Sequence, residues 1–135
     1  MDNYVIYTDG AYSAMRSQGG IGIIILKNGK KIKEFSKMYK NTTNNRMELL
    51  AVILGLKLLI NADSILIYSD SQYVIGCATL GWKRRVNTDL WEKYDIIFKN
   101  HNCKNIIFQH VKGHNGDIYN EECDKLAVFA SQLLD

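Results

Sequence analysis

Four acidic residues lie within or directly after apolar strand or helix patterns, where an unpaired charge costs free energy. Asp9 and Asp70 each follow a short run of β-forming residues. Glu48 and Asp124 each lie in an apolar pattern with helical spacing. Carboxylates that meet in one place repel one another unless hard cations neutralise them. A cluster built from carboxylates alone suits Mg²⁺ or Mn²⁺ and does not suit zinc, so these acids predict a divalent metal site if they converge.

Each acid also has a simpler interpretation. An Asp at the end of a strand is often a turn or helix cap, and Asp70 directly precedes a helical pattern. Glu48 would favour the positive N-terminal end of its helix. Taken singly, these residues leave both interpretations open, and only the set of four favours a functional site.

The histidines and cysteines do not form a recognised zinc pattern. His110 and His114 are four residues apart, but the end of a strand and a glycine separate them, so they do not share a helix face. The three cysteines, Cys77, Cys103 and Cys123, contain no CxxC pair. They fit buried thiols in a reducing compartment better than a disulfide framework or a structural zinc site.

The elements that must position the acids can be read from the periodicity of the chain. Apolar and β-branched runs predict strands over residues 3–9, 20–27, 30–39, 64–69 and 106–108. Helical spacing predicts helices over residues 44–60, 71–80, 90–98 and 123–130. The dipeptide Asn28-Gly29 is a strong hairpin signal between the second and third strands.

This order predicts the α/β class. Three antiparallel strands come first, and helical crossovers then require two parallel strands, which gives a five-stranded mixed sheet with helices on both faces. Asp9 and Asp70 would both lie at the carboxyl ends of strands, where ligand sites of open α/β sheets gather.

Composition is that of an ordinary globular protein. The chain has 135 residues, 47% hydrophobic and 23% charged, which excludes disorder and collagen and predicts one domain over residues 1–135. The longest apolar stretch, residues 49–60, is too short to span a membrane. The N-terminus lacks the basic flank of a signal peptide. We therefore expect a cytoplasmic monomer with no membrane partner.

Positive charge is unevenly distributed, although the net charge is only +3. Residues 27–40 contain six lysines and a single acid, Glu34. A second basic cluster is Lys83-Arg84-Arg85. Lysines can guard the edge of a sheet, or they can follow a phosphate backbone. Charge alone slightly favours the first interpretation.

Five segments together resemble the successive motifs of type 1 ribonuclease H. They are residues 7–11 (YTDGA), 43–49 (TNNRMEL), 68–74 (YSDSQYV), 111–116 (VKGHNG) and 120–127 (NEECDKLA). Each motif alone is weak, but all five occur in family order and cover essentially the whole chain. The resemblance implies the ribonuclease H-like fold, in a short form without the extended basic handle of some relatives.

The resemblance also implies a site with two Mg²⁺ ions, or Mn²⁺, bound by Asp9, Glu48, Asp70 and Asp124. In that scheme Asp9 bridges both ions, and Asp124 helps to hold the ion that activates water. Glu48 and Asp70 support the ion at the leaving 3′ oxygen. Two ions about 4 Å apart can stabilise both the attacking and the leaving oxygen of a phosphodiester, so no protein nucleophile is needed. His114 corresponds to a mobile histidine that passes protons and eases product departure, and its near-neutral reference pKa suits that task.

RNA differs from DNA by the 2′-OH, which polar side chains reach in a wide minor groove. Asn44, Asn45 and Gln72 resemble the family's contacts to the 2′-OH and base edges. Their simpler interpretation is helix capping for the two asparagines and solvent exposure for Gln72.

Four further residues are candidate substrate contacts. Thr43 and Asn87 match positions that hold a phosphate of the DNA strand. Arg46 is a candidate either to contact phosphate or to brace Glu48. Trp82 would line the DNA channel or lie partly buried in the core, whereas the helical pattern around Trp91 favours the core.

Three departures from the family pattern concern substrate contacts. Residues 13–18 (SAMRSQ) lack the usual loop rich in Asn, Pro and Gly. Position 41 is Asn where a basic residue is common, and Lys40 is a candidate replacement. Residues 76–91 leave no space for the basic handle, which predicts a weaker grip on substrate and stronger salt sensitivity.

The implied activity is endonucleolytic hydrolysis of the RNA strand of RNA–DNA hybrids, with 5′-phosphate and 3′-OH products. One alternative is a module that binds hybrid or double-stranded RNA without cutting, which the intact set of acids disfavours. The other is a DNA-directed nuclease of the same superfamily, which the amides placed for ribose contacts disfavour.

Overall fold

The computed structural model describes residues 1–59, 61–112 and 117–134, and within them the chain forms five strands and four helices. In chain order these are β1 (Asn3–Ser13), β2 (Gln18–Lys27), β3 (Lys30–Lys40), α1 (Asn44–Leu58), β4 (Ser64–Ser69), α2 (Gln72–Thr79), α3 (Thr88–Asn100), β5 (Ile106–His110) and α4 (Ile118–Ser131). The predicted order of strands and helices is therefore confirmed.

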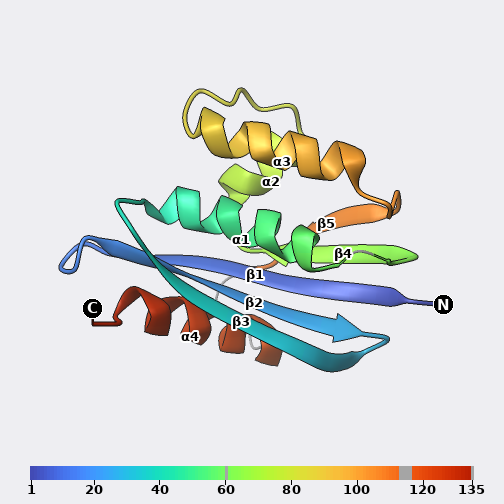
Figure 1. Ribbon diagram of the computed structural model, residues 1–135, viewed down its shortest axis with the longest axis horizontal. Coiled ribbons are helices and arrows are strands. Elements are labelled where there is room, and N and C mark those ends of the chain that lie inside the picture. The colour runs from blue at the N-terminus through green and yellow to red at the C-terminus, as the bar shows by residue number, and fades with distance from the viewer. Residues whose placement is uncertain (60, 113–116, 135) are drawn as a thin grey trace.

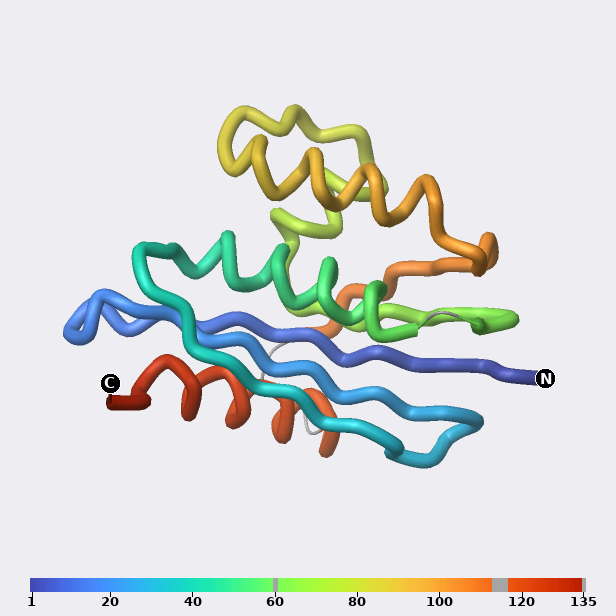
Figure 2. The backbone as a smooth tube through the Cα atoms, in the orientation of Figure 1, coloured from blue at the N-terminus to red at the C-terminus, as the bar shows by residue number. Residues whose placement is uncertain are grey.

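The strands form one mixed sheet in the order β3-β2-β1-β4-β5. β1, β2 and β3 pair antiparallel, whereas β4 pairs parallel with both β1 and β5. Helices α1, α2 and α3 lie on one side of the sheet and α4 lies on the other (Figure 1). The backbone trace shows the same layers, with α4 running beneath β1, β2 and β3 (Figure 2). The predicted α/β class, with helices on both faces, is confirmed.

The hairpin between β2 and β3 turns at Asn28 and Gly29, as predicted. Both residues have positive φ angles, 49° and 85°, which is the geometry of the two-residue turns that match strand twist. β1 and β2 are longer than predicted, because their pairing continues past Asp9 as far as Ser13 and Gln18. Gly10 interrupts the β-forming pattern, but backbone pairing to the facing strand carries the ladder on.

Two apolar layers hold the helices to the sheet. On the α1 side, side chains such as Ile6 and Ile23 are fully buried with Leu49 and Leu56 of the helix. On the α4 side, a smaller layer includes Ile24. Full burial of one such side chain contributes roughly 1.5–3 kcal/mol, so β2, buried on both faces, anchors both layers.

Trp91 of α3 is buried in the core, as its pattern predicted. The three cysteines are all buried, free thiols. Both ring nitrogens of His101 are engaged: Nδ1 accepts from the backbone N–H of Cys103, which leaves Nε2 to donate to the carbonyl of Leu56 at 3.0 Å. His101 therefore secures the end of α1. None of the described helices is both long enough and apolar enough to cross a bilayer.

Candidate active site

The sheet brings Asp9 and Asp70 to the same edge. β1 and β4 are parallel neighbours, and Tyr7 of β1 is in register with Tyr68 of β4. Asp9 and Asp70 each come two residues after these partners, so the register places them opposite one another. They lie at the carboxyl end of the parallel pair, as predicted.

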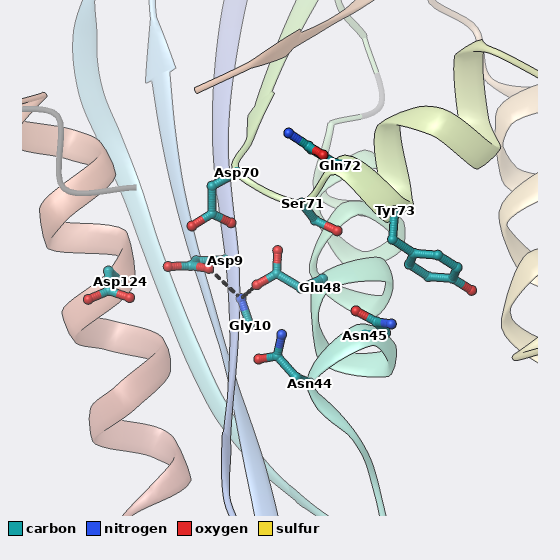
Figure 3. A pocket seen from close by; sticks show the side chains of 10 residues that line it. All are labelled: Asp9, Gly10, Asn44, Asn45, Glu48, Asp70, Ser71, Gln72, Tyr73 and Asp124. Atoms are coloured by element: carbon teal, nitrogen blue, oxygen red, sulfur yellow. Dashed lines mark hydrogen bonds between the residues drawn. The ribbon is translucent and has the colours of Figure 1, made fainter. Parts of the chain in front are cut away.

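Glu48 reaches Asp9 across Gly10. The backbone N–H of Gly10 donates to Asp9 Oδ1 at 2.9 Å and to Glu48 Oε1 at 2.6 Å (Figure 3). A Cβ at position 10 would lie 2.4 Å from the backbone nitrogen of Glu48, so only glycine lets α1 approach β1 this closely. Because the paired part of β4 stops short of this level, the Gly10 N–H is free to hold two carboxylates.

The acids converge on one pocket. Asp9, Glu48 and Asp70 each place a carboxylate oxygen within 4.8 Å of the others. Asp124 lies on α4, across from Asp9, and lines the same pocket without joining that group of three (Figure 3). The full lining is Asp9, Gly10, Asn44, Asn45, Glu48, Asp70, Ser71, Gln72, Tyr73 and Asp124.

The electrostatics of this cluster are those of a cation site. Asp9 and Glu48 are only 3% and 4% exposed. The pKa of Asp9 is raised to about 7, chiefly by burial and also by the nearby charges of Asp70 and Asp124, which together outweigh the lowering effect of its hydrogen bond with Glu48. Burial and the neighbouring Asp9 also raise the pKa of Glu48 well above its usual value.

Among the described residues that line the pocket, one buried side-chain oxygen lacks a hydrogen-bond partner. Glu48 Oε2 has no hydrogen-bond donor among the residues that the structure describes. A buried carboxylate oxygen left unpaired costs free energy, whereas a divalent cation would satisfy it and cancel the repulsion within the cluster. The all-oxygen donor set fits Mg²⁺ or Mn²⁺, so the residues present fit the implied metal. This cluster is the one potential metal-binding group found within the described ranges, and it contains no His or Cys.

The predicted amide contacts surround the acids. Asn44, Asn45 and Gln72 are exposed and line the pocket (Figure 3). Thr43, not either asparagine, caps α1, because its hydroxyl accepts from the backbone N–H of Arg46 at 3.2 Å. The cap therefore leaves both asparagine side chains available to a ligand.

Arg46 and Asn87 are engaged within the protein. Arg46 makes a two-pronged contact with Asp89 at 2.9 and 2.7 Å, which holds the pKa of that carboxyl well below its usual range. It also donates to Asn87 Oδ1 at 3.3 Å, and the amide of Asn87 donates to the Tyr73 hydroxyl. Within the described part of the chain Arg46 makes no hydrogen bond to Glu48, so it braces α3 and not the acid.

Trp82 was predicted to line a DNA channel or to lie partly buried in the core, and the structure shows features of both. Its side chain is 48% exposed, yet its ring packs so closely on Gly76 that a Cβ there would lie 2.1 Å away. The ring is therefore fixed in place with one face open to solvent, and its place in a DNA channel stays a prediction.

The basic cluster at residues 83–85 is smaller than the sequence suggests. The Arg84 guanidinium lies 4.3 Å from the centre of the Trp91 ring. Its Nε donates to the carbonyl of Cys77 at 3.2 Å, and its Nη1 contacts Asp95 at 2.7 Å. Arg84 is thus a packing residue, which leaves Lys83 and Arg85 as the exposed cations.

We expect Arg84→Ala to lower the free energy of unfolding by about 1–3 kcal/mol, because a half-buried cation–π contact, a part-buried hydrogen bond and an ion pair are all lost. Arg85→Ala, its exposed neighbour, should change that free energy by about 0.5 kcal/mol or less. Urea unfolding of both variants tests this pair. Equal effects of the two substitutions would contradict the packing role.

Two predicted features remain, His114 and the short segment at residues 13–18. His114 lies outside the described residues, and its role stays a prediction. The short segment at residues 13–18 ends on Gln18, whose buried amide donates to the carbonyls of Ser131 and Leu133 at 3.0 and 2.6 Å. This end of the β1–β2 connection therefore fastens the C-terminal end of α4.

Three residues that line the pocket were not predicted to do so. Gly10 follows Asp9, and Ser71 and Tyr73 flank Gln72, so position within the motifs was the available signal. The Tyr73 hydroxyl accepts from Trp91 Nε1 at 2.9 Å and from the side-chain amide of Asn87, the residue before α3, at 3.1 Å. The bond from Trp91 links a pocket residue to the core.

Comparison with known proteins agrees with this geometry. The family model for RNase H matches residues 1–132. A ribonuclease H of Trichodesmium erythraeum (strain IMS101) is 46% identical, over 96% of this chain and 89% of that protein. The crystal structure of RNase H1 from Halobacterium salinarum NRC-1 is 25% identical with a TM-score of 0.79, covering 95% of this chain and 96% of that one. LC11-RNase H1, solved in complex with an RNA/DNA hybrid, shares the fold at 24% identity and a TM-score of 0.79, covering 94% and 95%. With a family match along almost its full length and an acidic pocket at the expected strand ends, this chain belongs to the RNase H family.

Proposed function

We propose that this chain is an endonuclease that hydrolyses the RNA strand of RNA–DNA hybrids and leaves 5′-phosphate and 3′-OH ends. The observation that carries the proposal is the cluster of Asp9, Glu48 and Asp70, within 4.8 Å of one another, with an unpartnered buried oxygen on Glu48. In a member of this family, such a cluster supports metal-dependent cleavage of a phosphodiester.

The proposed cofactor is a pair of Mg²⁺ ions, with Mn²⁺ as a substitute. Asp9 would serve both ions, Glu48 and Asp70 the ion on the α1 side, and Asp124 the ion on the α4 side. Ions bound there supply positive charge to the attacking and leaving oxygens of the phosphodiester. The backbone holds the carboxylates in place: the N–H of Gly10 donates to Asp9 and Glu48, and β4 ends next to Asp70. His114 is the proposed proton carrier.

The proposed substrate follows from the groups around the acids. Asn44, Asn45 and Gln72 are exposed amides at the pocket rim, suited to hydrogen bonds with 2′-OH groups and base edges. LC11-RNase H1, which has this fold, was solved with an RNA/DNA hybrid bound, which supports a hybrid here. Lys83 and Arg85 are exposed cations for the backbone phosphates.

We propose further that residues 1–135 act as a single domain and as a monomer in the cytoplasm. The family match over residues 1–132 supports one domain. The three free, buried thiols suit a reducing compartment.

One experiment separates the candidate functions. Labelled RNA–DNA hybrid, duplex RNA and duplex DNA are each incubated with the protein in Mg²⁺ or in EDTA. We expect cleavage of the hybrid alone, in the RNA strand, and only with Mg²⁺. Binding without cleavage would point to a non-cutting module, and cleavage of duplex DNA to a DNA-directed nuclease.

A further inference from the structure

Asp124 differs from the other three acids in how it is held. Gly10 ties Asp9 to Glu48, and Asp70 follows directly from β4. Asp124 comes from α4, which packs on the opposite face of the sheet (Figures 1 and 3). Its carboxylate faces that of Asp9 across the pocket and interacts with it. Its distance from Asp9 therefore depends on how α4 docks against β1.

The Asp117 carboxylate joins the start of α4 to β1. The Tyr7 hydroxyl donates to Asp117 Oδ2 at 3.1 Å. The other oxygen, Oδ1, caps α4 by accepting from the backbone N–H groups of Tyr119 and Asn120 at 3.0 and 3.2 Å. Asp117 thus begins the helix and anchors it to the strand at the same time.

Packing fixes the Tyr7 ring that provides this anchor. The side chain is only 7% exposed. It stacks on Tyr68 of β4, with ring centres 4.8 Å apart, and contacts Tyr119 of α4 at 5.7 Å. A buried, packed hydroxyl has little freedom to find another partner, so its bond to Asp117 is well defined.

The Tyr7–Asp117 bond and the proposed ligands Asp9 and Asp124 lie along the same strand and the same helix. Tyr7 and Asp9 are two residues apart on β1, so they share the α4 face at a spacing of about 7 Å. Asp124 of α4 comes seven residues after Asp117, the N-cap of that helix, so the two lie nearly on one side of the helix, about 10 Å apart. The same strand and the same helix therefore meet at two successive contacts, first Tyr7 with Asp117 and then Asp9 with Asp124.

A third contact holds the helix against the sheet close to Asp124. The Cys123 thiol, next to Asp124, donates to the carbonyl of Gly22 at 3.1 Å. Gly22 of β2 is the register partner of Asp9. The helix is therefore secured at the level of Asp9 by a thiol, which is a weak donor, and at its N-terminal end by the stronger Tyr7 bond.

We propose that Tyr7 is a positioning residue. Through its bond to Asp117 it sets the distance between Asp124 and Asp9, and so the affinity of the site for the metal ion on the α4 side. The inference rests on the proposed function of Asp124 as a metal ligand. Loss of the hydroxyl lets the start of α4 move away from β1. An ion held by Asp9 and Asp124 would then bind more weakly, whereas an ion held by Asp9, Glu48 and Asp70 would keep its affinity.

The test is calorimetric titration of Mn²⁺ into purified protein. In Tyr7→Phe we expect affinity at one of the two sites to fall about 10-fold, as for other residues that orient metal ligands, with the other site unchanged. The Mn²⁺ concentration for half-maximal cleavage should rise in proportion, while KM for the hybrid stays constant.

Two further variants isolate the hydrogen bond. Asp117→Ser keeps a helix cap but is too short to reach Tyr7, so it should match Tyr7→Phe. Asp117→Asn keeps both contacts, because its amide can donate to the Tyr7 oxygen, and should bind Mn²⁺ like the wild type. Tyr68→Phe is the matched control, since it removes a hydroxyl from the stacked neighbour and leaves the anchor intact.

Wild-type Mn²⁺ binding in Tyr7→Phe, or equal weakening in Tyr68→Phe, would overturn the positioning role. Failure of the wild type to cleave hybrid would instead count against the proposed function. The calorimetric comparison of variants would still decide the role of Tyr7, because it requires no substrate.

Discussion

Asp9→Asn is expected to abolish cleavage of the hybrid, by about 10³-fold or more, and at the same time to stabilise the metal-free protein. Asp9 is the carboxylate proposed to serve both ions. Loss of several kcal/mol of charge stabilisation in the transition state corresponds to a rate loss of this size. Cleavage rates of wild type and variant in saturating Mg²⁺ measure the first effect.

The gain in stability follows from the raised pKa of Asp9. Burial places it at about 7 in the folded protein, whereas an unfolded Asp titrates near 3.9. Between these values the folded state binds more protons than the unfolded state, so metal-free stability falls as pH rises from about 4 to about 7. Above pH 7 the full cost of the buried charge is present. An Asn at this position carries no charge and avoids it.

We therefore expect Asp9→Asn to raise the free energy of unfolding by about 1–3 kcal/mol at pH 8 in EDTA, since each unit of raised pKa corresponds to about 1.4 kcal/mol. At pH 5 the difference should be smaller. Urea unfolding at both pH values tests this. Glu92→Gln, on the exposed surface of α3, is the control and should change neither stability nor activity. A variant less stable than wild type at pH 8 would contradict the electrostatic account.

Gly10→Ala is the second change with a large expected effect. The added Cβ would lie 2.4 Å from the Glu48 nitrogen and 2.6 Å from the Met47 carbonyl carbon, and backbone atoms cannot turn aside as side chains do. α1 must therefore retreat from β1. We expect a loss of about 1–3 kcal/mol in the free energy of unfolding and a Mg²⁺ requirement raised about 10-fold or more, because Glu48 moves away from Asp9.

Gly55→Ala provides the comparison for this change. Gly55 lies on the same helix and also faces β1, but the atoms nearest its Cβ would be side-chain carbons of Ile6, at 3.0 Å, and Thr8, at 3.9 Å. Alanine also favours the helix at this position. Gly55→Ala should therefore leave the Mg²⁺ requirement unchanged. A normal Mg²⁺ requirement in Gly10→Ala would show that the close approach at Gly10 does not set the position of Glu48.

The order of elements was predictable because its signals are local. Alternating β-branched residues and the Asn28-Gly29 turn specify the first hairpins. Strand-end acids indicated the side of the sheet on which the site lies. The extension of β1 past Asp9 was not predictable, because it depends on pairing with β2 and not on the propensities of its own residues.

Parts of the site depend on contacts between distant residues, and the sequence did not reveal them. Arg84 reads as a surface cation, but its environment is made by Trp91 and Asp95 of a later helix. Arg46 likewise finds its partner, Asp89, 43 residues further along the chain. The role of Gly10 lies in a backbone N–H and an absent Cβ, neither of which residue type alone discloses.

Diffraction from crystals grown with Mn²⁺ at pH 8 would examine the acidic pocket most directly, since Mn²⁺ scatters anomalously. We predict one peak within coordination distance of Asp9, Glu48 and Asp70, and a second between Asp9 and Asp124. Mn²⁺ bound elsewhere on the protein, with no peak beside these carboxylates, would contradict the account.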